Sequence, residues 1–225
     1  MGIAVGNEAE TLLISYYELL ERESRFLNLT AIKNPAEAAI KHFVDSLTVL
    51  KWVSFAVGDH LMDVGSGAGF PGIPLGIVQG GVRVVLLEAV KKKSNFQQRV
   101  IESLVLRNVE VIWGRAEECG REGEYRERFE WVVARAVAPL RELAEYMLPF
   151  ARVGGACIAF KGPKGKEEVK SAVKAVGILG GRIAEVKEYR LPITGDERLL
   201  VFIVKESQTP SAYPRRAGIP RKKPL

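Results

Sequence analysis

The sequence predicts an open α/β sheet of about seven mostly parallel strands, in a Rossmann-like arrangement with helices on both faces. Three observations support this prediction. From about residue 58 onward, short apolar runs rich in β-branched residues alternate with helical patterns, as parallel strands joined by helices do. The first run leads into a glycine-rich loop. The last two are joined by a short turn, so at least one strand there is expected to run antiparallel.

A helical cap is expected to precede the sheet. Apolar side chains around Tyr16 recur at helical spacing. A second helix is predicted to start after Asn34, a capping residue followed by Pro35, and to run nearly to the end of the cap. We divide the chain, as one compact unit, into a cap (1–57), an α/β domain (58–206) and a basic tail (207–225).

The elements of the α/β domain follow from the alternating pattern. Strands are predicted at 60–64, 82–89, 109–114, 129–137, 156–162, 182–193 and 197–206. Helices are predicted from about 71 and at 91–107, 115–122, 139–151 and 166–179. A ligand is expected outside the carboxyl ends of the central strands.

Composition narrows the class of protein. The chain has 225 residues, of which 47% are hydrophobic, enough for one globular core. It has no run of about 18 uncharged apolar residues and no secretory pattern, so a cytoplasmic protein is expected. Cys119 and Cys157 are too few for a disulfide framework or a four-cysteine zinc site, and no metal is expected. The net charge of +6 is concentrated in the tail, which predicts a phosphate-bearing partner or a solubilising terminus.

The glycine loop "GSGAG" after the first strand predicts a nucleoside cofactor. Glycines at Gly65 and Gly67 permit close backbone approach, and Glu88 at the end of the second strand can accept hydrogen bonds from both ribose hydroxyls. A dinucleotide and S-adenosylmethionine both fit this pattern. Pro71 lacks the amide that would support a pyrophosphate, and the terminal hairpin also favours S-adenosylmethionine. After the third strand, Ala116 can lie beside an adenine ring.

Seven stretches of the chain resemble one known family. "NLTAI", "KHFVDSL", "DVGSGAGFPGIPL", "RAEE", "ARAVAPL", "FKG" and "YPRRAGIPRKKPL" occur in this order between Asn28 and Leu225. They resemble the glucose-inhibited division protein B family of bacterial 16S ribosomal RNA guanine-N7 methyltransferases. The resemblance implies the S-adenosylmethionine-dependent methyltransferase fold, with S-adenosyl-L-homocysteine as product, and 16S rRNA in the small ribosomal subunit or an assembly intermediate as partner. The cofactor contacts it implies, together with those expected from the loop, are Gly65, Gly67, Phe70, Glu88, Ala89, Val90, Ala116, Glu117 and Arg135.

Two positions depart from the family pattern. Glu130 stands where the family usually has an aspartate, which leaves open how the edge of the site is polarised. Val44 replaces a commoner leucine or isoleucine and is expected to be a packing change. Phe70 and Glu117 also have simpler explanations, as a core aromatic and as an acid in the first turn of a helix.

The expected chemistry needs no catalytic base. Guanine N7 carries a lone pair and no proton, so positioning for in-line transfer accounts for much of the rate. The fourth strand is not followed by an Asp-Pro-Pro-Tyr motif, and no Pro-Cys pair offers a nucleophile. Arg135 and Lys161, at the carboxyl edge, are the positioning candidates, with a plain ion pair or solvated charge as the alternative. RNA contacts are predicted at Lys161, Lys164, Arg215, Arg216, Arg221, Lys222 and Lys223.

His42 and Asp45 lie three residues apart on one face of the second predicted helix. We expect them to form hydrogen bonds between cap and sheet, with Asn28 as a candidate partner, rather than to bind a metal. Three other functions remain open: an NAD-linked oxidoreductase, a non-catalytic RNA-binding module with the same fold, and a small-molecule methyltransferase. The last would not need the basic tail, so deleting that tail would leave its activity unchanged.

Overall fold

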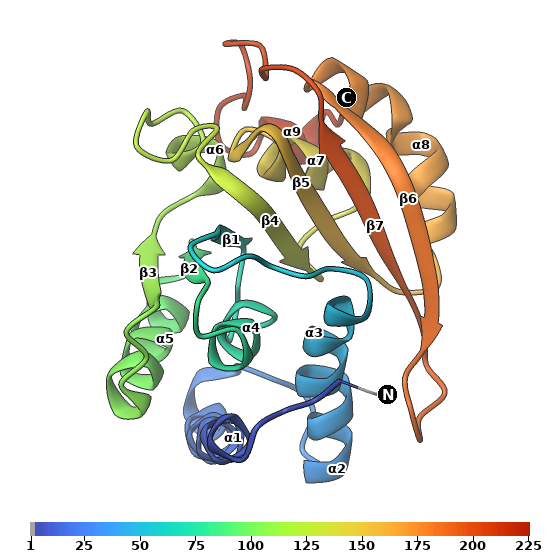
Figure 1. Cartoon of the computed structure of the whole chain (residues 1–225). Helices are drawn as coiled ribbons and strands as arrows, with labels where there is room; N and C mark the ends of the chain where they lie inside the picture. Colours follow the sequence, from blue (N-terminus) through green and yellow to red (C-terminus); the bar gives the residue numbers. More distant parts are fainter. Residues whose placement is uncertain (1–2) are drawn as a thin grey trace.

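The computed structural model describes residues 3–225 and confirms the predicted sheet (Figure 1). Seven strands lie in the order β3-β2-β1-β4-β5-β7-β6. The first five pair in parallel, and β7 runs antiparallel to both of its neighbours, as the hairpin predicted. The strands are β1 (His60–Val64), β2 (Arg83–Glu88), β3 (Val109–Trp113), β4 (Phe129–Arg135), β5 (Ala151–Lys161), β6 (Gly181–Arg190) and β7 (Glu197–Lys205).

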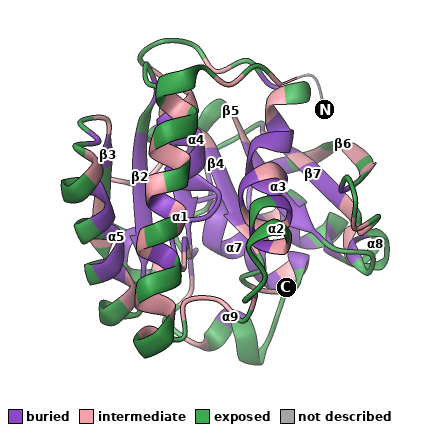
Figure 2. Ribbon diagram, turned by 90° about the horizontal axis from the view of Figure 1, so that it is seen from below, coloured by how far each residue is buried: buried purple, intermediate pink, exposed green. Residues whose placement is uncertain are grey.

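Helices cover both faces of the sheet, so the central strands are buried on both sides (Figure 2). One apolar cluster joins the cap to α4 (Gly72–Val78) and α5 (Lys91–Leu104) through the same face of the sheet. A second cluster fills the opposite face. The helices on that side are α6 (Ala116–Cys119), α7 (Leu140–Met147), α8 (Gly165–Ile178) and α9 (Ile219–Lys222).

The cap begins with α1 (Asn7–Leu27), which buries Tyr16 and Leu20 against the sheet layer. The Asn34 side chain accepts a hydrogen bond from the Glu37 amide at 3.1 Å, so the predicted cap of the next helix is confirmed. The predicted second helix is confirmed as a continuous helical segment over 35–51, but it ends at Lys51, short of Gly58, and its hydrogen bonding is not uniform. The chain forms α2 (Pro35–Ala38), a π-helical segment (Ala39–Val44), α3 (Asp45–Leu47) and a 3₁₀ turn (Thr48–Lys51).

A tertiary contact accompanies this irregularity. The Arg135 side chain, at the end of β4, donates to the carbonyl oxygens of Lys41 and His42 within the π-helical segment. A side chain that takes up helix acceptors widens the local turn, and such segments are common at functional sites. The cap helix is therefore shaped by its contact with the carboxyl edge of the sheet.

The tail after β7 folds back over α6 and α7. The Arg126 side chain donates to the carbonyl oxygens of Thr209 and Tyr213, and Arg121 donates to that of Pro214. The last residue, Leu225, packs against the second apolar cluster and accepts a hydrogen bond from Arg141 near the start of α7. These contacts bring the chain terminus close to the carboxyl edge of β4.

Candidate active site

The glycine loop lies between β1 and α4 and leaves open space above its backbone. Gly67 has a φ of +62°, and a Cβ built there would meet one atom within 4 Å, the Gly65 carbonyl oxygen at 3.9 Å. Gly65 also has a positive φ, and its Cβ would lie 2.8 Å from Val137 in the loop after β4. The two glycines therefore serve different purposes. Gly65 lets two loops meet, and Gly67 keeps a surface of the loop free.

Glu88, predicted to accept from ribose hydroxyls, is joined directly to this loop. Its Oε2 accepts from the Gly67 amide at 2.8 Å, and its Oε1 accepts from the Val90 amide at 2.7 Å. The side chain is buried at the carboxyl end of β2. Each carboxylate oxygen can accept a second hydrogen bond. Glu88 can thus hold the loop and still offer an acceptor to each of two neighbouring hydroxyls.

The loop is fixed from beneath by buried polar groups. Gln97 of α5 donates through Nε2 to Ser66 Oγ at 2.7 Å and to the Gly67 carbonyl at 2.8 Å. Asp63, at the end of β1, accepts from the Gly72 amide at 2.8 Å through Oδ2, whereas Oδ1 has no hydrogen-bond partner within residues 3–225. Burial raises the pKa of Asp63 to about 7. A preorganised loop of this kind suits ligand binding.

Phe70 lies between the loop and the cap. Its ring stacks with Tyr16 at a centroid distance of 5.1 Å and with His42 at 4.8 Å, and it meets Phe43 edge-on. The side chain is only 5% exposed. The Arg135 guanidinium lies 5.1 Å from the ring centroid. Packing between cap and loop accounts for all of these contacts, which is the simpler of the two explanations for this residue.

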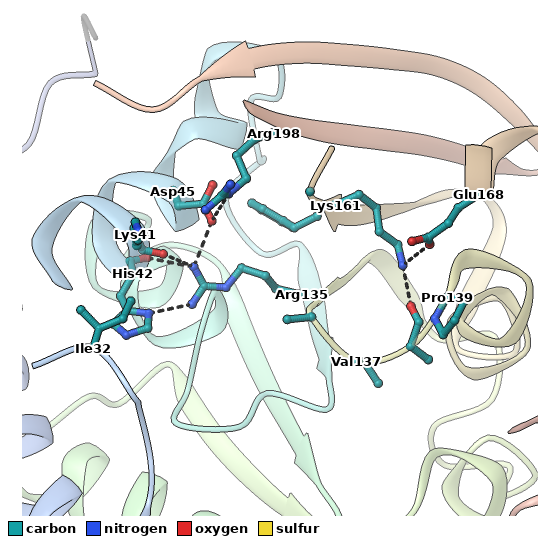
Figure 3. A pocket seen from close by; sticks show the side chains of 14 residues that line it. Ile32, Lys41, His42, Asp45, Arg135, Val137, Pro139, Lys161, Glu168 and Arg198 are labelled. Carbon is teal, nitrogen blue, oxygen red and sulfur yellow. Dashed lines mark hydrogen bonds and ion pairs between the residues drawn. The ribbon is translucent and has the colours of Figure 1, made fainter. Parts of the chain in front are cut away.

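A pocket of about 600 Å³ opens beside the loop, between the cap and the carboxyl ends of β4 and β5. Figure 3 shows Arg135 on one side of it and the Lys161–Glu168 pair on the other. The pocket contains four cationic side chains and two carboxylates, so it favours an anionic or phosphate-linked ligand. It is lined by Ile32, Lys41, His42, Asp45, Arg135, Ala136, Val137, Ala138, Pro139, Phe160, Lys161, Gly162, Glu168 and Arg198.

Asp45 connects the cap to three strands at the wall of this pocket. Its carboxylate is 3.3 Å from Arg135 Nη1, accepts from the Tyr189 hydroxyl at 2.7 Å, and lies 3.7 Å from Arg198 Nε. The carboxylate is almost fully buried. Burial, together with the Asp45 charge, raises the pKa of Tyr189 well above its ordinary value. The expected hydrogen bonding between cap and sheet is present, centred on Asp45.

His42 lies in the same wall and is neutral at pH 7. Burial, followed by the charge of Arg135, lowers the pKa of His42 to about 4. Its Nε2 lies 2.7 Å from Thr30 Oγ1, so its partner is Thr30 and not Asn28. A neutral imidazole that is already hydrogen-bonded orients the wall of the pocket. It adds no charge beside the guanidinium.

The two predicted lysines of the β5–α8 loop differ in their surroundings. Lys161 is buried, donates to the Ala138 carbonyl and forms an ion pair with Glu168 at 2.8 Å. It therefore braces the loop after β4. Lys164, at the start of α8, is exposed. Of the two side chains, Lys164 is the one free to approach an external phosphate.

The predicted tail residues also divide into two groups. Arg215 forms an ion pair with the buried Glu145 of α7 at 2.6 Å. The carboxylate of Glu117, predicted to lie near the cofactor, accepts from the Gly218 amide at 2.9 Å, next to half-buried Ala116. The start of α6 and the tail are thus in direct contact. The remaining tail cations are exposed: Arg216, Arg221, Lys222 and Lys223.

Glu130, whose effect on the site the sequence left open, lies away from the pocket. Glu130 lies at the start of β4, where it accepts from the His60 amide at 2.9 Å and forms an ion pair with Arg152. This is the amino edge of the parallel sheet, opposite the loops that carry Gly67 and Arg135. An aspartate or a glutamate there acts on the far side of the molecule.

Among the residues of the pocket wall, sequence reasoning missed Lys41 and Arg198. Lys41 lies in the cap and Arg198 in β7, and their meeting depends on how the β6–β7 hairpin curves toward the cap (Figure 1). The signal for Lys41 is the "KHFVDSL" stretch, in which it precedes Asp45 by one helical turn, whereas no local pattern indicates Arg198. Within residues 3–225, no three metal-ligating side chains gather at one place, and no helix is long and apolar enough to span a bilayer.

Comparisons with known proteins agree on one family. The family model for rRNA small subunit methyltransferase G matches residues 9–198. A protein of Pelotomaculum thermopropionicum, named ribosomal RNA small subunit methyltransferase G, is 51% identical over 225 residues, covering 100% of this chain and 94% of that protein. The protein of the same name from Desulforamulus reducens is 46% identical, covering 97% and 91%.

Solved structures support the fold at lower identity. A variant of MtNAS in complex with S-adenosylmethionine superposes with a TM-score of 0.58 at 20% identity, covering 88% of this chain and 76% of that one. Aeropyrum pernix fibrillarin with natively bound S-adenosyl-L-methionine gives 0.56 at 19% identity, with coverage of 74% and 76%. The chain therefore shares its Rossmann-like fold with these proteins.

Proposed function

This chain belongs to the rRNA small subunit methyltransferase G family, and on that premise we propose that it transfers the methyl group of S-adenosylmethionine to N7 of a guanine in 16S rRNA. The observation that carries the proposal is the family match over 9–198 together with 51% identity along the whole chain. A ribosomal substrate would place the enzyme in the cytoplasm.

The loop residues fit S-adenosylmethionine. The open surface above Gly67 would accept the methionine portion, and the remaining acceptor sites of Glu88 would receive the two ribose hydroxyls. Ala89, Val90 and Ala116 lie at the ends of β2 and β3, where the adenine ring would be held. Glu117 would bound this subsite while its carboxylate holds the tail. When bound, S-adenosylmethionine supplies an electrophilic methyl group on a positively charged sulfonium.

The pocket between cap and sheet would hold the guanine. Because N7 needs no deprotonation, the task of the side chains is to fix the ring and keep N7 free of donors. Arg135 is already engaged by Asp45 and two cap carbonyls, so it would act mainly by positioning the wall and by its charge. His42, neutral at pH 7, is held by Thr30 and would act in the same way.

The exposed cations would contact the RNA backbone. We assign phosphate contacts to Lys164, Arg216 and the last basic residues of the tail, Arg221, Lys222 and Lys223. Lys161 and Arg215 would act indirectly, since Glu168 and Glu145 pair with them. Whether the substrate is naked 16S rRNA, an assembly intermediate or the small subunit is decided by presenting each in the same assay.

The test uses S-adenosylmethionine labelled on the methyl group and small ribosomal subunits from cells that lack the enzyme. Label should enter 16S rRNA, and the modified position should become cleavable by borohydride and aniline, as N7-methylguanine is. No label in subunits, assembly intermediates or naked RNA would refute the proposal. Label without cleavage would retain the methyltransferase and reject N7.

Two glycine substitutions test whether the surface of the glycine loop binds the cofactor. Gly67→Ala places a Cβ in the open surface and should weaken binding of S-adenosylhomocysteine about tenfold or more, which corresponds to ~1.4 kcal/mol. Gly58→Ala is the matched control, because Gly58 also has a positive φ and open space but lies at the amino edge. Calorimetric titration measures both variants. Equal loss in both would mean that backbone strain, and not the loop surface, determines affinity.

A further inference from the structure

Trp113 is the last residue of β3 and is largely exposed. Its side chain is 56% exposed, while Trp52 packs against Tyr189 and Trp131 against Phe55. The indole is nevertheless held in place. Its Nε1 donates to the Ala89 carbonyl at 3.1 Å, and Lys91 Nζ lies 4.1 Å from the ring centroid. An exposed aromatic ring with a fixed orientation is the property of a stacking surface.

The Trp113 ring and the expected adenine subsite lie on opposite faces of the sheet. Side chains alternate along a strand, and Val109 and Val111 pack into the cluster that contains α5. Ile112 and Ala116 pack into the cluster on the opposite face. Trp113 therefore lies on the α5 side of the sheet. Because β3 is the edge strand, no further strand covers the ring.

Positive charge surrounds the ring. Lys91 and Lys92 are exposed and Lys93 is half-buried, all in the first turn of α5. Neither Lys92 nor Lys93 forms an ion pair within the described part of the chain, and the contact of Lys91 is with the ring. An aromatic face bordered by free cations matches an unpaired base with its neighbouring phosphates, which single-stranded nucleic acid provides.

We propose that Trp113 and Lys91 form a platform on which an unpaired base of the RNA stacks, with Lys92 and Lys93 on the adjacent phosphates. The inference rests on the proposed function and adds a second contact point for the same substrate. Three strand spacings separate β3 from β4, so the platform lies roughly 14 Å from the pocket along the carboxyl edge. The stacked base would be a few nucleotides from the methylated guanine.

The first measurement is the affinity of the full chain for a twelve-nucleotide single-stranded oligoadenylate, by fluorescence anisotropy at fixed low salt. Stacking on an aromatic side chain predicts that Trp113→Ala weakens binding about 5- to 100-fold. Trp113→Phe should restore most of the affinity, because stacking needs only an aromatic face. Val57→Ala removes an exposed apolar side chain near the amino edge and should leave the affinity unchanged.

Two further readouts decide the role of the ring. Oligoadenylate should quench tryptophan fluorescence in the wild-type protein and not in Trp113→Phe, and Lys92→Gln should reduce the salt dependence of binding. Affinity for S-adenosylhomocysteine should not change in Trp113→Ala. Unchanged RNA affinity in Trp113→Ala would overturn the proposal. A loss of S-adenosylhomocysteine affinity with RNA binding intact would make Trp113 a wall of the cofactor site.

The platform and the proposed activity fail in different ways. If the wild-type protein binds oligoadenylate through Trp113 but labels no rRNA, the platform stands and the methyl transfer is refuted. If rRNA is labelled with equal efficiency by wild type and Trp113→Ala, the activity stands and the platform is rejected.

Discussion

Asp63 gives the sharpest test of the electrostatics beneath the glycine loop. The carboxyl group is fully buried at the end of β1, accepts one hydrogen bond from Gly72, and leaves Oδ1 without a partner in the described chain. Burial is the main cause that raises its pKa to about 7, although Gly72 and Arg135 act in the opposite direction. In the unfolded chain the same group titrates near pH 4. Folding therefore favours the protonated acid.

The sign of the pH dependence follows. Between about pH 4 and 7 the unfolded chain has lost this proton and the folded protein keeps it, so stability falls as the pH rises through this window. A difference of about three pH units corresponds to a loss of ~4 kcal/mol, reached above pH 7. Asp63→Asn keeps an acceptor for Gly72 and carries no charge at any pH. We expect it to match the wild type near pH 5 and to be ~2–4 kcal/mol more stable at pH 8.

Urea unfolding of the ligand-free protein, followed by circular dichroism at pH 5, 6, 7 and 8, measures this difference. Glu110→Gln is the control, because it removes an exposed carboxylate from β3 and leaves the loop intact. The stability curves of wild type and Asp63→Asn should converge at low pH and separate as the pH rises. A variant that is less stable than wild type at pH 8, or one that retains the full slope, would refute a buried and largely protonated Asp63.

Two further substitutions test the ion pairs that hold the cap and the tail. Asp45→Ala leaves Arg135 without a carboxylate partner and Arg198 with Asp196 alone, and should cost about 3–5 kcal/mol, with faster hydrogen exchange in the cap; unchanged exchange would mean that the cap is held by apolar packing alone. Arg215→Gln leaves Glu145 buried and unpaired, and a similar loss is expected together with proteolysis of the tail. If the tail of Arg215→Gln resists protease as well as wild type does, the ion pair does not anchor it.

The sheet was predictable because its signals are local. The strand 60–64 was predicted with the bounds that the structure has, and the others differ mostly at their ends. Apolar runs, and the glycines that interrupt them, determine such elements independently of distant parts of the chain. The placement of Glu88 beside the glycine loop agrees with the same logic, since parallel neighbours end at one edge, although its hydrogen bond to Gly67 was not predicted.

The cap and the pocket wall were less predictable because they depend on distant partners. Residues 35–51 have a continuous helical pattern, yet the chain changes through π-helical and 3₁₀ turns where Arg135 reaches the carbonyls of Lys41 and His42. That contact spans more than ninety residues. Local propensity contains no information about it, so the pattern predicted the helix but not its π-helical and 3₁₀ turns.

Charge was the most misleading of the sequence signals, for a physical reason. Arg135, Lys161 and Arg215 were all candidates for contact with substrate or RNA, and each is paired with a carboxylate in the fold. A buried cation must be neutralised inside the protein, because an unpaired charge there costs several kcal/mol. Whether a cation is buried depends on tertiary contacts, which composition does not contain. The cations available to the proposed RNA substrate are therefore those on exposed turns and helix starts. Among these, the lysines beside Trp113 are accompanied by an aromatic surface that charge counting overlooks.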